Sequence, residues 1–241
     1  MSATTQQFIA EQRQLNKRRA MLHPAYRRLL SLIAKVEIEG LENLPSSGST
    51  LLLGNHVSIV DPILITGSIK SRFVISMAKA ETLNHPIERL GLRIWGNYVI
   101  NRGEIDRTAL NNTIALLKDE QLVWIAPEGT RNPNGLGEAR AGVSFIAHKA
   151  DAVLVPIVLC GIQDWLQRLK SFKRMYVKMV IGKPFKFHIP EGERLSRDVR
   201  EQMMTEAMYQ LAKTIPDEYA SQRGIYSDFE QGTTKYLKFL T

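Results

Sequence analysis

Hydrophobic and polar positions along the chain fall into two alternating kinds of segment. Short apolar runs bounded by turn residues predict buried strands at 50–54, 72–77, 98–101, 122–126, 153–160 and 177–181. Between them, apolar residues recur at helical spacing and predict helices at 61–68, 106–120, 141–150 and 196–214. Strands that alternate with helices favour an α/β fold, with a mixed, largely parallel sheet flanked by helices.

The N-terminal residues 1–38 are predicted to form a separate pair of basic helices. The first helix covers residues 1–22, and Pro24 suits the first turn of the second because its missing N–H costs nothing there. From 25 to 36 the apolar side chains fall on one arc of the helix and the basic ones on the other. Two interpretations stay open: a helix packed on its own domain, or an interfacial helix with its apolar face in lipid.

The rest of the chain is predicted as one α/β domain at 39–215, followed by a polar tail at 216–241 for which the sequence indicates no place. A chain of 241 residues is long enough to bury a full core. The single cysteine, Cys160, excludes an internal disulfide and lies in an apolar run, so it is predicted to be a core residue.

The net charge of +8 is concentrated in two stretches without acidic residues, 12–36 and 168–178. Such patches suit anionic lipid headgroups, nucleic acid or a polyanionic cofactor. The first stretch holds a single aromatic residue for stacking on bases, Tyr26, so nucleic acid is not an expected partner. The sequence has no apolar run long enough to span a bilayer and no signal peptide, which predicts a cytosolic protein or one attached to the cytosolic face of a membrane.

The string Asn55-His56-Val57-Ser58-Ile59-Val60-Asp61 joins a predicted strand to a predicted helix. A strand–turn–helix corner lets the Asp61 carboxylate fold back to one nitrogen of the His56 imidazole while the other takes a proton. The alternative is structural, with Asp61 only capping the helix and His56 a turn residue. Ser58 lacks the glycines of a nucleophile elbow, and the other histidines lack metal-ligand spacing, so neither a serine hydrolase nor a metal site is expected.

A second chemical string, 127–131, follows another predicted strand. Gly129 permits a tight turn with exposed N–H groups, Thr130 adds a hydroxyl, and Arg131 can bind a phosphate through a bidentate fork. Glu128 would repel a phosphate, so it is expected to bond a substrate hydroxyl or a neighbouring arginine. The alternative is an ordinary loop with a surface arginine.

Four motifs in order carry a resemblance to a known family. They are the Asn-His-x4-Asp string, a Gly-x-x-hydrophobic-Ile-x-Arg string ending at Arg102, Pro-Glu-Gly-Thr-Arg, and Val-Pro-Ile at 155–157. Over about Glu39 to Gly182 the chain resembles the glycerolipid acyltransferases, which include the 1-acylglycerol-3-phosphate acyltransferases.

The resemblance implies a role for each matching residue. His56 would be the general base and Asp61 the acid that orients it. Arg102 and Arg131, with the Glu128–Thr130 turn, would bind the acceptor phosphate, and Lys79 would aid the oxyanion. Asn55 is expected among the substrate-binding residues, and the Val-Pro-Ile motif near the acyl site.

The chain departs from the family pattern at three places: Ala126 stands where an aromatic is common, Asn132 where serine is frequent, and Asn101 where an acid often precedes the arginine. None of them removes a group that moves a proton, so they bear on acceptor identity more than on activity.

The expected function is therefore transfer of a fatty acyl group to the free hydroxyl of 1-acylglycerol 3-phosphate, giving phosphatidic acid in phospholipid biosynthesis. The donor would be an acyl thioester on coenzyme A or acyl carrier protein, with no other cofactor. Alternatives are another acceptor (glycerol 3-phosphate, a lysophospholipid or an aminoacyl lipid) or a non-catalytic basic protein of the membrane surface. Expected partners are the lipid acceptor, the thioester donor, an anionic membrane surface and an acyl carrier protein.

Overall fold

A central β-sheet organises the molecule, as seen in the computed structural model, which describes residues 3–101 and 106–240. Its main path runs in the order β1-β7-β6-β2-β5-β3-β4, and β8 and β9 extend it beside β6. The strands are β1 Ala34–Glu39, β2 Thr50–Gly54, β3 Val74–Lys79, β4 Tyr98–Ile100, β5 Leu122–Ile125, β6 Val153–Cys160, β7 Met175–Ile181, β8 Phe185–Phe187 and β9 Leu237–Phe239. Strands β6, β2, β5, β3 and β4 are mutually parallel, whereas β7 is antiparallel to β6. The predicted mixed, largely parallel α/β sheet is confirmed.

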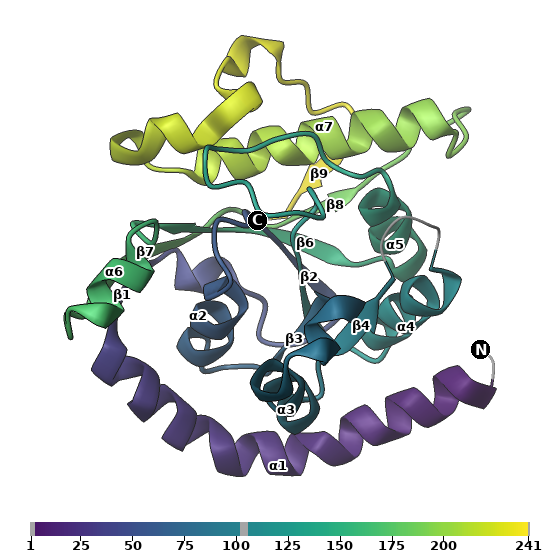
Figure 1. Cartoon of the computed structure of the whole chain (residues 1–241). Coiled ribbons are helices and arrows are strands. Elements are labelled where there is room, and N and C mark those ends of the chain that lie inside the picture. The colour runs from purple at the N-terminus through teal and green to yellow at the C-terminus, as the bar shows by residue number, and fades with distance from the viewer. Residues whose placement is uncertain (1–2, 102–105, 241) are drawn as a thin grey trace.

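Helices cover both faces of this sheet (Figure 1). They are α1 Ala3–Ile33, α2 Asp61–Ser68, α3 Pro86–Trp95, α4 Arg107–Lys118, α5 Gly142–Ala150, α6 Trp165–Lys170 and α7 Arg197–Thr214. Helices α4, α5 and α7 pack on one face, over a core that includes Leu51, Leu53 and Val123. Helix α2 and the end of α1 pack on the other, over Leu52 and Trp124. Because neighbouring strand residues point to opposite faces, the uninterrupted apolar strands serve both layers.

The predicted pair of N-terminal helices is wrong, because α1 is one bowed helix that runs through Pro24 (Figure 1). Residues 34–36, predicted as its last turn, instead open β1, which pairs with β7, so the boundary predicted after residue 38 falls inside a strand. A proline inside a helix removes a hydrogen bond and usually breaks it. Here His23 and Tyr26, on either side, contact backbone carbonyls of α2 at 3.0 and 2.8 Å. These contacts with α2 thus keep α1 helical on both sides of Pro24.

The first half of α1 is held by the C-terminal end of α3. Arg19 is fully buried and donates to the carbonyl of Trp95 at 2.7 Å, while Gln12 donates to that of Gly96 at 2.9 Å. The last carbonyls of a helix lack partners within it and attract a cation. Burial lowers the pKa of Arg19 to about 10. This arginine therefore fastens two helices and is not part of the exposed basic surface of α1.

The C-terminal segment, which the sequence left without a place, closes over α7. A kinked 3₁₀ segment, Asp217–Tyr226, with non-helical backbone at Tyr219 and Gly224, and a short 3₁₀ helix, Phe229–Gln231, lead to β9, which pairs with β8. Glu206 of α7 is fully buried and accepts the backbone N–H groups of Lys235 at 3.0 Å and Tyr236 at 2.8 Å. The end of the chain is thereby tied to the body of the fold.

Candidate active site

The predicted chemical strings meet at one edge of the sheet. Strands β2, β5 and β3 are adjacent and parallel, so their carboxyl ends lie together. His56 follows β2, the turn of Glu128 follows β5, and Lys79 ends β3. Arg102 lies outside the described residues.

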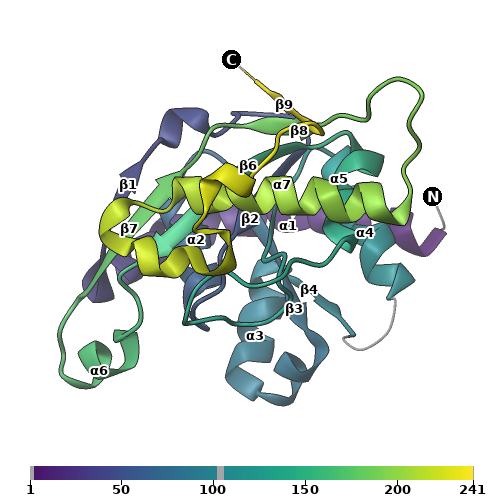
Figure 2. The ribbon, with the colours of Figure 1, turned by 90° about the horizontal axis from the view of Figure 1, so that it is seen from above.

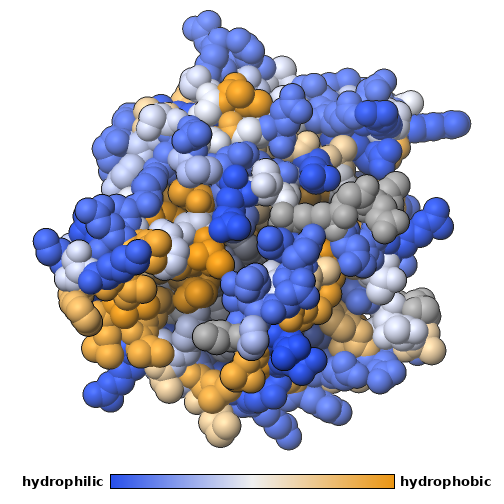
Figure 3. All heavy atoms as spheres, in the orientation of Figure 1, coloured by the Kyte–Doolittle hydropathy of each residue, from blue (hydrophilic) through white to orange (hydrophobic). Residues whose placement is uncertain are grey.

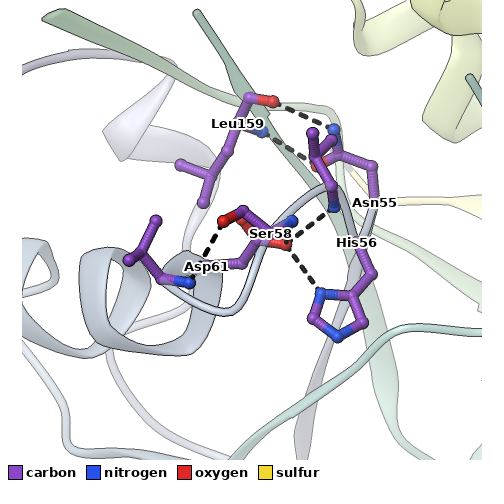
Figure 4. Close-up of polar contacts among 7 residues, drawn as sticks. Asn55, His56, Ser58, Asp61 and Leu159 are labelled. Carbon is purple, nitrogen blue, oxygen red and sulfur yellow. Dashed lines mark hydrogen bonds and ion pairs between the residues drawn. The ribbon is translucent and has the colours of Figure 1, made fainter. Parts of the chain in front are cut away.

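His56 and Asp61 form a hydrogen-bonded pair in the loop between β2 and α2 (Figure 4). The distance between His56 Nδ1 and Asp61 Oδ2 is 2.7 Å. The same oxygen accepts the backbone N–H groups of Val57 at 2.8 Å and Ser58 at 2.9 Å. The Asp61 side chain is 1% exposed and that of His56 17%, so the acid is sealed inside the loop while the imidazole reaches the surface.

The alternative in which Asp61 serves only as a helix cap is wrong. Val60 is the N-cap of α2, and Asp61 is already helical, with its carboxylate turned back into the loop. Because the carboxylate accepts from Nδ1, it holds the proton on that nitrogen and leaves the lone pair of Nε2 free. This is the arrangement of a general base.

Trp124 of β5 supports the imidazole from the side. Its ring lies 5.7 Å from that of His56 at an interplanar angle of 84°. Gly54 makes room for it, since a Cβ there would come within 2.3 Å of Trp124 Nε1. The sequence analysis missed Trp124; its signal is a glycine at the end of an apolar strand, before the histidine.

Asn55 fixes the backbone in front of the histidine. Its amide nitrogen donates to the carbonyl of Leu159 at 3.0 Å, and its amide oxygen accepts the N–H of Leu159 at 2.9 Å (Figure 4). The side chain is buried and extends the pairing of β2 with β6 by one residue. Asn55 therefore has a positioning role in this structure, and its predicted role in substrate binding stays a prediction.

The second string is bonded directly to the first. The backbone N–H of Asn132 donates to the carbonyl of His56 at 2.7 Å. Glu128 is buried, and its Oε2 accepts from the Asn132 amide and from the N–H of Gly137 at 3.0 Å. Burial raises the pKa of Glu128. The expected bond to an arginine is absent among the described residues, where Glu128 instead ties the turn to the loop that follows it.

The turn is tight, as predicted, but the N–H of Gly129 is not exposed, because it donates to the carbonyl of Ala126 at 3.1 Å. Gly129 has a φ of 69°, in the left-handed region that favours glycine. A Cβ at Gly129 would lie 2.5 Å from Arg140 Nε, so the Arg140 side chain crosses the turn. Thr130 and Arg131 are exposed. Two guanidinium groups therefore accompany the turn, and Arg140, nine residues beyond the string, was missed by the sequence analysis.

Lys79 and the fourth string flank this centre. Lys79 is half-buried at the end of β3, two strands from β2, a separation of about 10 Å. Pro156 of β6 pairs with Leu53 of β2. On the other side of β6, Leu154 pairs with β8 and residues 157–160 pair with β7. Pro156 lies between these two pairings, so its missing N–H interrupts neither of them.

Other nucleophiles and ligands do not join the site. Cys160 is fully buried as predicted, and burial raises its thiol pKa to about 12. Ser58 is buried in the loop that encloses Asp61. Within residues 3–101 and 106–240, no group of three or more His, Cys, Asp and Glu side chains is placed to hold a metal ion.

Comparison with known proteins decides the family. A family model described as Acyltransferase matches residues 35–160, more than half of the chain. The chain belongs to the acyltransferase family. Membership supports the predicted enzyme class, an O-acyltransferase.

Three relatives are 1-acyl-sn-glycerol-3-phosphate acyltransferases. That of Bacillus subtilis is 29% identical over 191 residues, 78% of this chain and 91% of the relative. That of Borreliella burgdorferi is 29% identical over 128 residues, 52% of this chain and 51% of the relative. The chloroplastic enzyme of Arabidopsis thaliana is 35% identical over 133 residues, 53% of this chain and 36% of the relative. The chain thus spans nine tenths of the Bacillus relative but only about half or less of the other two.

One solved structure shares the fold. The crystal structure of the 1-acyl-sn-glycerophosphate acyltransferase PlsC from Thermotoga maritima superposes with a TM-score of 0.57 at 23% identity, covering 77% of this chain and 74% of that one.

Proposed function

We propose that the chain transfers a fatty acyl group from an acyl thioester to the free hydroxyl of 1-acylglycerol 3-phosphate, giving phosphatidic acid. The observation that carries the proposal is the His56–Asp61 pair, bonded at 2.7 Å, beside a turn accompanied by Arg131 and Arg140. A base next to two guanidinium groups suits a hydroxyl acceptor that carries a phosphate. The names of the three relatives point to the same acceptor.

The reaction follows from the orientation of the imidazole. His56 Nε2 takes the proton of the acceptor hydroxyl while its oxygen attacks the thioester carbon. As the tetrahedral oxyanion collapses, the carbon–sulfur bond breaks and the leaving thiolate takes the proton from the imidazolium. Asp61 stabilises the imidazolium between these steps. Transfer is direct, since neither Cys160 nor Ser58 is placed as a nucleophile.

Binding of the acceptor holds its hydroxyl in a fixed orientation near His56, which lowers the entropic part of the barrier. Arg131 binds the phosphate with help from Arg140 and Thr130. The resemblance assigns a further phosphate contact to Arg102, which lies outside the described residues, and Lys79 stabilises the oxyanion from the end of β3. The donor is coenzyme A or an acyl carrier protein, and both present the same thioester.

The site of action that we propose is the cytosolic face of an anionic membrane, to which the protein attaches peripherally. In the part of the chain that the structure describes, no helix is long and apolar enough to cross a membrane. The basic excess of +8 favours an anionic surface.

The test is a screen of purified protein against acyl donors and acceptors, with His56→Ala as the decisive variant. We expect transfer to 1-acylglycerol 3-phosphate, and a loss of roughly 10²–10⁴-fold in kcat for His56→Ala. His148→Ala is the matched control, because His148 lies in the last turn of α5, at the opposite edge of the sheet. Transfer to another acceptor alone would replace the proposed substrate, and near-normal turnover by His56→Ala would refute the mechanism.

A further inference from the structure

A small helical projection between β6 and β7 carries exposed apolar side chains. This α6 hairpin, residues 165–174, stands away from the body of the fold (Figure 2). Leu166 and Leu169 are 46% and 45% exposed, and Phe172 at the tip is 99% exposed. Trp165, at the base, packs against the core below α2. The hairpin is therefore anchored at its base and apolar at its free end.

Nothing in the fold accounts for an aromatic residue at the tip. Phe172 follows the cap residue of α6 and has a φ of 52°, a left-handed conformation that favours glycine. Its side chain is fully exposed and so adds nothing to the core. A phenylalanine here is explained by something outside the chain.

The charges around the tip indicate what that is. No acidic residue lies between 165 and 174, and the segment carries Arg168, Lys170, Lys173 and Arg174. Arg168 is paired with Asp164, just before the segment, at 2.6 Å, so the excess charge lies on the other three. Lys170 and Lys173 are exposed on either side of the tip. An apolar end within a collar of cations is complementary to an anionic lipid surface, where acyl chains lie beneath negative headgroups.

The surface of the α6 hairpin is continuous with that of the last turns of α1. Arg174 donates to the carbonyl of Ala34 at 3.3 Å, and Lys35 and Arg168 both lie over the ring of Tyr176, at 6.0 and 5.7 Å from its centroid. The last turns of α1 expose two further leucines, Leu29 and Leu32. Hydrophobic residues gather on this side of the surface, at the lower left of Figure 3.

This surface lies at the edge of the sheet that holds the active site. Strand β6 is parallel to β2, so the hairpin leaves the sheet at the same edge as His56. Between them, Ile59 of the histidine loop and Ile63 of α2 are exposed. A lipid surface that meets the hairpin therefore also meets the entrance of the site.

We propose that the α6 hairpin inserts Phe172 and its neighbouring leucines into the interface of an anionic bilayer, with Lys170 and Lys173 among the headgroups. This insertion places the edge of the sheet that carries His56 against the membrane surface in which a lipid acceptor lies. The proposal rests on the peripheral attachment proposed above and names the segment that makes it; only the seating of the catalytic edge rests on the proposed acyl transfer, since binding to the bilayer does not require catalysis.

The experiment is flotation of the full chain with vesicles of phosphatidylcholine, with and without phosphatidylglycerol. We expect binding to the anionic vesicles, falling as salt is added. Phe172→Gly should lower the partition coefficient about tenfold. It should leave the melting temperature equal or higher, because glycine suits the backbone there. The double variant Lys170→Glu/Lys173→Glu should lose at least about 30-fold on anionic vesicles, because each lysine near the surface contributes about a fivefold factor.

Leu41→Ser is the matched control. Leu41 is 45% exposed, like Leu169, but follows β1 at the opposite edge of the sheet, so this variant should bind as the wild type does. Equal binding of Phe172→Gly and wild type, or equal wild-type binding to both kinds of vesicle, would overturn the proposal. A dimer in solution that Phe172→Gly dissociates would overturn it too, by assigning the tip to a second copy of the chain.

Activity separates this inference from the proposed function. If the wild type floats with anionic vesicles but transfers no acyl group, the proposed function fails and the hairpin assignment stands. Phe172→Gly should keep wild-type kcat on an acceptor dispersed in detergent and lose turnover on vesicles. Loss in both would contradict a role confined to docking.

Discussion

Replacing Asp61 with asparagine removes the charge that faces His56 while keeping the size of the side chain. The Asp61 Oδ2 atom accepts from His56 Nδ1 and from the N–H groups of Val57 and Ser58. An asparagine oxygen can still accept the two backbone bonds, so the loop is expected to keep its shape. Because Oδ2 takes all three bonds, the asparagine oxygen that keeps the backbone bonds also keeps the bond from Nδ1, and the amide nitrogen takes the place of Oδ1, which has no partner in the described part of the chain. The substitution therefore removes the charge and leaves the tautomer of His56 as it is.

The size of the effect follows from the charge lost in the transition state. The imidazolium lies against the carboxylate, with 2.7 Å between nitrogen and oxygen. Two unit charges about 4 Å apart interact by about 4 kcal/mol at an effective dielectric constant of about 20. Since about 1.4 kcal/mol is a factor of ten in rate, kcat should fall roughly 10³-fold.

The assay compares kcat and KM for the lipid acceptor with the melting temperature of each variant. Asp61 is sealed from the surface, so KM should stay within about threefold of the wild-type value. Ser58→Ala is the control in the same loop, because the Ser58 hydroxyl makes only one long contact, 3.5 Å from the N–H of Val60. A folded Asp61→Asn enzyme that loses less than about tenfold in kcat would refute the assignment of Asp61 as the orienting acid.

Three further predictions follow from single contacts. Arg131→Gln should raise KM for the acceptor about 10- to 100-fold, since a charge-assisted hydrogen bond is worth about 1.5–3 kcal/mol. KM for an acceptor without a phosphate should not change. An equal rise in KM for both acceptors would contradict phosphate binding by Arg131. Gly224→Ala should lower the free energy of unfolding more than Gly192→Ala. Both glycines have a positive φ, which costs an alanine about 1 kcal/mol, but of the two only Gly224 would place a Cβ against a backbone oxygen, that of Leu136, at 2.0 Å. Equal melting temperatures of the two variants would contradict this clash. Burial lowers the pKa of His23 below 6.5, so below that pH the unfolded chain binds more protons than the folded one and the wild type should lose stability. The His23→Gln variant should lose less stability over the same pH range. Curves of unfolding free energy against pH that run parallel for the two proteins would contradict this.

The buried strands were predictable because each is a local pattern. Strand β2 and helix α2 have the predicted bounds, and β5 and β6 differ from theirs by at most one residue. A continuous apolar run between turn residues has few other ways to bury its surface.

Strand β1 shows where local pattern failed. Its apolar residues also fit the arc of a helix, and its alternating burial appears only when it lies beside β7, about 140 residues later. A helix pattern of this length is ambiguous until a pairing partner is present.

The same division holds at the active site. The spacing of His56 and Asp61 determines their meeting, because a strand–turn–helix corner of six residues brings the carboxylate back to the ring. The environment of the pair comes from elsewhere in the chain: Trp124 beside the imidazole, Asn132 bonded to the loop, and Leu159 holding Asn55.

Composition and local order in the chain thus specified the strands at the centre of the sheet, the acid–base pair and the turn beside it. Tertiary structure decided that α1 passes its proline, that Asn55 positions the backbone, that Arg140 crosses the turn, and that α6 presents Phe172 at the catalytic edge. Each of these depends on contacts between segments that are separated in the sequence. Contacts between residues tens to more than a hundred positions apart leave no periodic trace in the sequence, so only the folded chain reveals them.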